Sequence, residues 1–519
     1  MELEKRIIHK NENAGKAFSQ ITLDDDYNLP DYKPDLTKVI RERGKLHFDE
    51  IRINSGHILM KGVLRFQILY RTDLDGKKIN YLKGEIPFQE NLSIDGIEET
   101  DAVKVDGRIE DISVSVINSR KLSIRSLVEF HGVADRGSEE EILTGIKEEN
   151  TCETERENLD ILELVMDKKD TLRIRQELPL SSNKPNIEEI LWNSVEPRGV
   201  DCYLEEGKIE VAGEALVQVL YASVEDGEHL QWFETTVPIK GSIECSSCTK
   251  EQICRIKTEL SQVNIEITGD EDGEARVLLL ELVMNLEISL WQEVQIEMLS
   301  DMYALDRQIQ PEFKKTCFEK LMVKNEAKCR VFERAELEEE QEDILQVCMN
   351  ETQLNIEQMT RTEDGILAEG ILTVEILYIT ADDTMPLSAK KVYIPFHQML
   401  EMPATGENVN ICMDGSIDQL TTLLADNRSI DVKAVITLRL LALEQMEKQL
   451  ITQIHEEELD VKALQQRPGL VGYIVREGDR LFGIAREHHT TVENIIEMNG
   501  LSSQQIRPGE KLLIVKTVM

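Results

Sequence analysis

The sequence is poor in aromatic residues, in cysteines and in positive charge. Aromatic residues make up 5% of the chain, and its nine cysteines are scattered and odd in number, which fits a reducing compartment better than a disulfide framework. Acidic residues outnumber basic ones by 99 to 59, and the net charge of −40 repels phosphate backbones and anionic lipid surfaces. Nucleic acid and membranes are therefore poor partners, whereas a basic protein surface is a suitable one.

Long apolar runs and catalytic motifs are missing as well. The apolar runs are short, as in Ile436–Leu443, and none approaches the roughly eighteen residues of a membrane span. The first ten residues resemble no secretory signal, so we expect no export by the general route. The sequence has no Gly-rich phosphate loop, no Gly-x-Ser-x-Gly elbow and no His-Glu-x-x-His helix, and its many carboxylates are typical of a solvated surface. We therefore expect no enzymatic activity and no cofactor.

One group of cysteines is spaced like part of a metal site. Cys245 and Cys248 are separated by two residues, and Cys254 follows shortly after them. Zinc needs four converging ligands, and the sequence offers neither a second pair at a suitable spacing nor a nearby histidine. We interpret these residues as reduced loop cysteines and expect no metal, with a structural metal or a redox role as the alternative.

One segment of the chain recurs three times. Gly62–Tyr70, Gly213–Tyr221 and Gly370–Tyr378 align without a gap, and 151 and 157 residues separate the successive tyrosines. At the same distance after each tyrosine, a proline precedes a large apolar residue: Pro87-Phe88, Pro238-Ile239 and Pro395-Phe396. The spacing is that of whole domains and exceeds the period of a solenoid repeat. We conclude that one domain has been copied within the chain.

Each copy predicts antiparallel strands. Apolar residues alternate along the segment in every copy, at Leu64, Phe66, Ile68 and Tyr70, at Ala215, Val217, Val219 and Tyr221, and at Leu372, Val374, Ile376 and Tyr378. The opposite face carries Gln67, Gln218 or Glu375, so we expect a strand packed on a core from one side. The recurring proline cannot donate to a sheet, which predicts the end or the edge of the returning strand.

Turns and short helices are expected between these strands. Asp75-Gly76 and Asp226-Gly227 predict tight hairpin turns, and Asp383-Thr384 in the third copy predicts a different one. Proline suits the first turn of a helix, so short helical pieces are plausible over Pro34–Ile40 and Pro185–Leu191. We predict a mainly-β protein with three antiparallel, sandwich-like repeats over residues 1–145, 146–300 and 301–458, a linker over 459–469, and a small βααβ module over 470–519.

The last module differs from the repeats in composition and pattern. It carries six basic and six acidic residues between Leu470 and Lys516, so the excess negative charge lies in the repeats. The pattern predicts a short strand over Gly472–Val475, helices from about Leu481 and Val492, and a final strand after Ile506. Asp479 is the expected N-cap of the first helix, and Thr490 or Thr491 that of the second.

The module resembles a LysM domain. The matching residues are Tyr473, Val475, Gly478, Asp479, Leu481, Ile484, Ala485, Val492, Ile495, Asn499, Ile506, Pro508, Gly509, Lys511, Leu512 and Ile514. The resemblance implies a βααβ fold and a shallow groove for N-acetylglucosamine glycans, here formed by Gly478, Asp479, Arg480, Leu481, Ile506 and Pro508. Arg480 stands where threonine is usual and Gly483 where serine is common, and the added charge of Arg480 suits a protein ligand.

Tandem repeats of this kind ahead of one LysM domain resemble the SPOCS family of spore-forming Firmicutes. The resemblance implies a non-enzymatic scaffold of the spore coat or envelope, located in the mother-cell cytoplasm at the outer surface of the forespore. It also implies that the LysM domain binds the coat-basement ATPase, stage IV sporulation protein A. The alternative is a protein that binds peptidoglycan of the spore cortex or cell wall. A LysM-bearing wall hydrolase, the third hypothesis, finds no support in the motifs.

Overall fold

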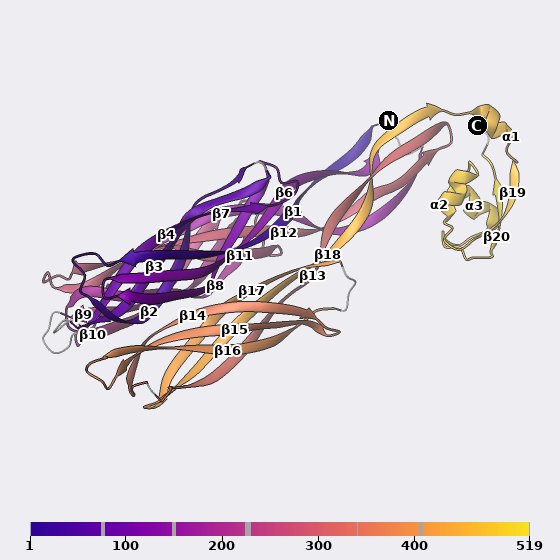
Figure 1. Ribbon diagram of the computed structural model, residues 1–519. Coiled ribbons are helices and arrows are strands. Elements are labelled where there is room, and N and C mark those ends of the chain that lie inside the picture. The colour runs from indigo at the N-terminus through magenta and orange to yellow at the C-terminus, as the bar shows by residue number, and fades with distance from the viewer. Residues whose placement is uncertain are drawn as a thin grey trace.

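The computed structural model describes residues 2–54, 56–73, 78–147, 152–223, 230–339, 341–403 and 408–517. Eighteen long strands form three repeats, each made of two three-stranded antiparallel sheets, and a small module follows them (Figure 1). In repeat 1, β6 (Lys121–Ile146) lies between β1 (Leu3–Asn28) and β5 (Ala102–Asn118), and β3 (His57–Thr72) lies between β2 (Leu36–Asn54) and β4 (Ile79–Ser93). Apolar side chains of the two sheets pack together, which makes the repeat a β-sandwich.

Repeats 2 and 3 have the same topology. In repeat 2 the sheets are β7–β12–β11 and β8–β9–β10, with bounds β7 (Cys152–Pro179), β8 (Ile187–Glu205), β9 (Lys208–Ser223), β10 (Leu230–Glu244), β11 (Ile253–Gly269) and β12 (Ala275–Ala304). In repeat 3 they are β13–β18–β17 and β14–β15–β16, with bounds β13 (Arg307–Glu336), β14 (Ile344–Arg361), β15 (Gly365–Thr380), β16 (Leu387–Glu401), β17 (Val409–Asp426) and β18 (Ser429–Glu458).

The recurring glycine and proline occupy the same strand positions in all copies, and the recurring tyrosine makes the same hydrogen bond in the first two. In the third copy Tyr378 is likewise fully buried, but Glu342 stands at the position of Pro34 and Pro185. Gly62 pairs with Phe88 across β3 and β4, and a Cβ at Gly62 would overlap the backbone of His47 and approach the Phe88 ring. The fully buried Tyr70 hydroxyl donates to the Pro34 carbonyl at 3.1 Å, and Tyr221 repeats this bond to Pro185 at 3.3 Å. The recurring proline lies in β4, β10 or β16, which are edge strands, as predicted.

Of the predictions for helices and turns, one is wrong, one falls outside the described residues and one can be compared with an observed turn. The helical pieces expected at Pro34–Ile40 and Pro185–Leu191 are wrong, because those segments lead into β2 and β8, whose pairing with β3 and β9 outweighs the local preference of proline. Asp75-Gly76 and Asp226-Gly227 lie outside the described residues. Asp383-Thr384 lies in a turn that the Asp382 carboxylate stabilises by accepting from the Thr384 N–H at 2.8 Å.

The polar face of the central strands is also buried, contrary to the prediction of a strand packed from one side. Gln67 and Gln218 are 7% and 2% exposed, and their neighbours Leu69, Leu220 and Leu377 are fully buried. These faces of the three repeats meet one another. The residues that join them there are called the axial junction below and come from β2, β3, β8, β9, β14 and β15: Arg41, Arg43, Gln67, Leu69, Leu191, Trp192, Gln218, Leu220, Met349, Glu351, Glu375 and Leu377. The three sandwiches thus share a second core that no single repeat could form.

The longest strands continue beyond the sandwiches as three two-stranded ribbons, made by β1 with β6, β7 with β12 and β13 with β18 (Figure 1). The ribbons pack on one another through an apolar cluster, called the ribbon junction below: Ile8, Ile142, Leu159, Ile161, Ile296, Met298, Phe318 and Leu450. A second cluster, which includes Leu143, Met302 and Ile451, continues this contact toward the ribbon ends. The ribbons therefore form one stalk.

The C-terminal module lies at the free end of this stalk (Figure 1). Antiparallel strands β19 (Leu470–Ile474) and β20 (Lys511–Val515) flank helices α2 (Leu481–Glu487) and α3 (Val492–Asn499), which confirms the predicted βααβ order. A short helix, α1 (Val461–Gln466), occupies part of the expected linker. Thr491 caps α3 as predicted, whereas the N-cap of α2 is Arg480 and not Asp479.

Candidate functional site

The first rim of the candidate groove is the turn that follows β19. Gly478 is exposed and has a φ of 87°, a backbone conformation that favours glycine. The Asp479 carboxylate accepts from the Arg476 N–H at 2.7 Å and from the Tyr473 hydroxyl at 2.8 Å. These bonds hold the pKa of Asp479 below its ordinary value, so the carboxylate is ionised and closes the turn instead of capping α2.

The second rim is the loop before β20, and the backbone joins it to the first. The Gly509 N–H donates to the Val475 carbonyl at 2.8 Å, and the Val475 N–H donates to the Glu510 carbonyl at 2.9 Å. Pro508 is exposed on this loop, and Ile506 is half-buried against the core of the module. The structure therefore brings Gly478, Ile506 and Pro508 onto two connected rims, although they are far apart in sequence.

Two of the predicted groove residues have other surroundings. Leu481 is 2% exposed and belongs to the core of the module, so its side chain is not available to a ligand. Arg480 extends to the stalk, where its Nη1 lies 3.1 Å from Oε1 of Glu155 on β7. The sequence could not reveal this pairing because 325 residues separate the two side chains.

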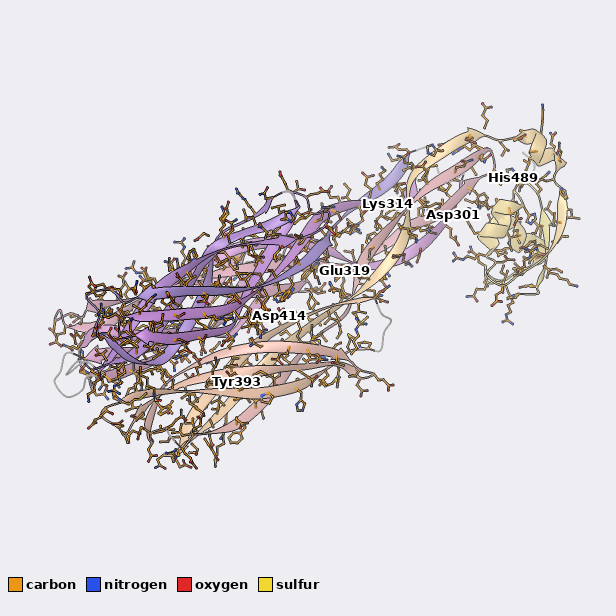
Figure 2. All side chains as sticks on the ribbon, viewed as in Figure 1. Asp301, Lys314, Glu319, Tyr393, Asp414 and His489 are labelled. Carbon is orange, nitrogen blue, oxygen red and sulfur yellow. The ribbon has the colours of Figure 1, made fainter. Side chains whose placement is uncertain are left out.

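More contacts join the module to the same ribbon. The Tyr303 hydroxyl, near the end of β12, donates to the Thr490 carbonyl at 2.8 Å, and the Tyr303 ring packs edge-on against Phe482 with 5.0 Å between ring centroids. Arg486 forms an ion pair of 2.6 Å with Asp301. Figure 2 shows Asp301 at the ribbon end, facing the module that carries His489. Sequence analysis missed this interface, and no local pattern around Tyr303 indicates it.

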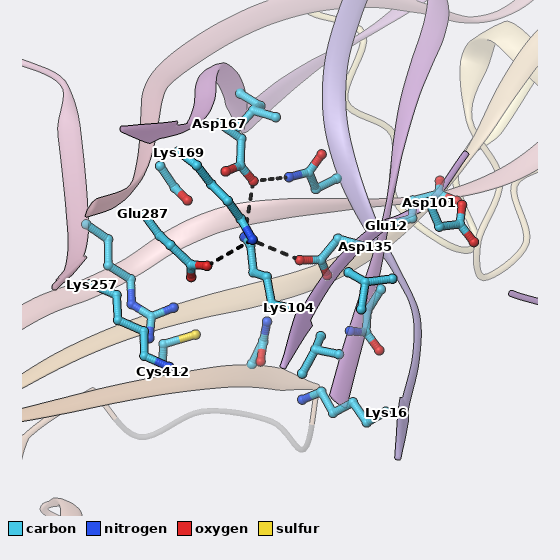
Figure 3. A pocket seen from close by; sticks show the side chains of 18 of the residues that line it. Glu12, Lys16, Asp101, Lys104, Asp135, Asp167, Lys169, Lys257, Glu287 and Cys412 are labelled. Carbon is cyan, nitrogen blue, oxygen red and sulfur yellow. Dashed lines mark hydrogen bonds and ion pairs between the residues drawn. The ribbon is translucent and has the colours of Figure 1, made fainter. Parts of the chain in front are cut away.

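A second candidate site is a cavity of about 2480 Å³ that is lined by residues of all three repeats. Figure 3 shows Lys104 of repeat 1 between two carboxylates, with Nζ 3.6 Å from Asp135 and 3.3 Å from Asp167 of repeat 2. Lys169 pairs with Glu287 at 3.2 Å in the same wall. Because these charges neutralise one another within and between repeats, the arrangement fits a hydrated structural junction better than a ligand site.

The cysteines singled out by their spacing lie in the core of repeat 2. Cys245, Cys248 and Cys254 are 7%, 1% and 6% exposed, and burial raises the pKa of the Cys248 thiol. Burial thus keeps that sulfur protonated and unreactive. Within the described part of the chain, no group of three or more His, Cys, Asp or Glu residues is arranged to hold a metal ion.

None of the helices described is long and apolar enough to cross a bilayer.

Comparison with protein families agrees with this architecture. The model of the SipL SPOCS domain matches three times, at residues 35–117, 186–268 and 343–424, and the LysM domain model matches residues 473–515. The SPOCS matches begin near the start of β2, β8 and β14 and end near the end of β5, β11 and β17, so they cover the same part of each repeat. Both families are non-catalytic, and the LysM domain makes peptidoglycan binding possible. No curated protein and no solved structure matches the chain.

Proposed function

We propose that this chain, which belongs to the family that combines SipL SPOCS domains with a LysM domain, is a non-enzymatic scaffold for assembly of the spore coat or envelope. In this proposal the LysM groove binds the coat-basement ATPase, stage IV sporulation protein A. The protein acts in the mother-cell cytoplasm, at the outer surface of the forespore. Its family makes it a sporulation-related protein; the partner and the location are the proposed part.

The observation that carries the proposal is the position of the groove. The LysM domain lies at the free end of a stalk that all three repeats build together, and Gly478 and Pro508 on its rims are exposed. A stalk with a binding module at its end suits a protein that connects a surface to other components. The repeats carry nearly all of the excess negative charge, which disfavours direct contact with anionic lipids and leaves attachment to a protein.

The proposal is tested by retention of the purified full-length chain on immobilised stage IV sporulation protein A. We expect retention, its loss in a chain lacking residues 470–519, and at least a tenfold loss for Pro508→Asp, which places a charge on the exposed rim. Ser502→Asp is the matched control, because this exposed serine lies outside the predicted groove residues and receives the same charge. Unchanged retention of the truncated chain would overturn the proposal.

The second candidate function is peptidoglycan binding, which the LysM match favours. Retention of the same four proteins on purified peptidoglycan separates the two. If the full-length chain binds peptidoglycan but not the ATPase, and Pro508→Asp abolishes this binding, the protein is a glycan binder. Leu481→Asp is unsuitable for either test because Leu481 is a core residue, and loss of binding would then report unfolding.

A further inference from the structure

The LysM domain follows repeat 3 in the chain, but it packs on the ribbon of repeat 2. The apolar part of this contact consists of Tyr303 and Leu305, which are 5% and 9% exposed and share one cluster with the LysM core. Phe482 of α2 covers the Tyr303 ring. A tyrosine at a ribbon end would otherwise be largely exposed, so its burial and its hydrogen bond to Thr490 both depend on the docked domain.

Opposite charges surround this apolar contact. Glu155 and Asp301 of the ribbon face Arg480 and Arg486 of the LysM domain, at 3.1 Å and 2.6 Å. Each of the four side chains is partly exposed, so the pairs contribute little free energy but define the orientation of α2. Arg480 is one of the two residues that depart from the usual LysM pattern, and Glu155 of the ribbon supplies a partner for its charge.

We propose that the end of the β7–β12 ribbon is a docking surface for the LysM domain, and that Arg480 is a positioning residue of this interface and not a ligand contact. Docking fixes the first turn of α2 through the contacts of Arg480 and Phe482 with the ribbon. The same turn adjoins Gly478 of the groove, so a docked domain presents the groove in one orientation relative to the ribbons. Such preorganisation lowers the ordering cost when a partner binds.

Hydrogen exchange of the full-length chain tests the docking. We expect Tyr303→Ala to raise the exchange rate of amides in 481–490 about tenfold or more, and Arg480→Glu to raise it by a smaller factor. Adding Glu155→Arg to Arg480→Glu restores the opposite charges and should restore protection, a rescue that a general loss of stability would not show. Lys511→Glu is the control, since it makes the same charge change on an exposed β20 position away from the ribbon. Unchanged exchange in Tyr303→Ala would overturn the docking surface.

The role of Arg480 rests on the proposed function and has a separate test. Arg480→Thr introduces the residue usual in LysM domains, and we expect its retention on purified peptidoglycan, or on the ATPase, to stay within about twofold of the unaltered chain. A tenfold loss with protection of 481–490 maintained would make Arg480 a ligand contact and overturn its assignment. If the unaltered chain binds neither probe, the proposed function fails and the assignment of Arg480 fails with it, whereas hydrogen exchange still decides the docking surface.

Discussion

The three repeats meet in two places that differ in chemistry. At the axial junction, Arg41 of repeat 1 lies 2.7 Å from Glu351 and 2.8 Å from Glu375, both of repeat 3. Glu351 also accepts from Arg43 and from the indole N–H of Trp192 in repeat 2, each at 2.9 Å. At the ribbon junction, eight buried apolar residues form the contact, and a polar contact lies beside them: the Glu140 carboxylate of repeat 1 accepts from Lys314 and Thr316 of repeat 3 at 2.8 Å and 3.0 Å.

The axial junction shows how copies of one domain acquire fixed positions relative to one another. Arg41, Trp192 and Met349 are equivalent, since they pair with the equivalent residues Leu69, Leu220 and Leu377. Each copy thus carries a different side chain at one position, and these side chains are complementary: the Arg41 guanidinium lies 5.1 Å from the centre of the Trp192 ring. At the axial junction, only one arrangement of the copies brings Arg41, Trp192 and Glu351 together, which is a specificity role for buried polar groups.

The largest expected effect is at Glu351. Glu351→Ala removes the acceptor that Arg43 and Trp192 share and the ion-pair partner of Arg41, and we expect a loss of about 3–5 kcal/mol in the free energy of unfolding. Urea denaturation followed by tryptophan fluorescence measures it. Glu357→Ala on the same strand is the control, because Glu357 is exposed and its removal should cost under about 0.5 kcal/mol. Equal costs for both variants would contradict a specific axial junction.

Conservative substitutions test how strictly each junction requires its side chains. Arg41→Lys keeps the charge but loses the Nε bond to Glu375 and the stacking on Trp192, so it should cost at least about 1.5 kcal/mol. Ile161→Leu in the ribbon junction conserves volume in an apolar contact and should cost under about 1.5 kcal/mol. Thermal unfolding of the two variants in the same buffer shows which substitution lowers the stability more. The reverse order would show that the ribbon junction is the more demanding of the two.

Acid should weaken the axial junction selectively. Burial opposes ionisation of Glu351, but Arg41 and Arg43 outweigh it and hold the pKa of Glu351 below its ordinary value. A lowered carboxyl pKa stabilises the fold at pH values above the unfolded pKa, about 4.3, and this contribution is lost as the pH falls toward the folded value. The stability difference between the unaltered chain and Glu351→Gln should therefore shrink below about pH 4.3. A difference independent of pH between 3 and 7 would contradict this account.

The smallest effect is expected at an exposed ion pair between repeats. Lys257 lies 3.1 Å from Asp106 in the wall of the central cavity, and their side chains are 50% and 66% exposed. Water screens such a pair, so Lys257→Ala should cost under about 0.5 kcal/mol in urea denaturation. A cost comparable to that of Glu351→Ala would show that ion pairs between repeats stabilise the protein wherever they lie.

Much of the fold could be predicted from the sequence because the landmark residues act within one repeat. Tyr70 bonds to Pro34 in the first copy and Tyr221 to Pro185 in the second, and the glycine of each copy lies opposite the residue after the recurring proline. These requirements therefore recur at the same spacing in the sequence. The predictions failed where contacts between repeats determine which side chains are buried. Gln67 and Gln218 resemble a solvated strand face, yet they are buried because another repeat covers them. Their polarity serves the axial junction, where Arg43 donates to Gln67 at 2.9 Å.

For the candidate site, too, local features were predicted correctly and features that depend on the folded structure were not. The order of strands and helices in the LysM domain and the cap at Thr491 follow from local pattern, and they were predicted correctly. Asp479 was assigned to the wrong role because other donors compete for its carboxylate: the Tyr473 hydroxyl and the Arg476 N–H donate to it before α2 begins. Leu481 matched the family pattern, but a match does not distinguish a core residue from one that lines a groove.

The number of repeats, their antiparallel strands and the separate C-terminal module can all be read from the amino-acid order, because alternation and capping act between near neighbours in the chain. The association of the repeats, the formation of a stalk by the ribbons and the free side of the LysM domain became visible only in the folded molecule. Those outcomes depend on pairs such as Arg41 with Glu351 and Tyr303 with Thr490, whose members are far apart in the chain and become neighbours only on folding.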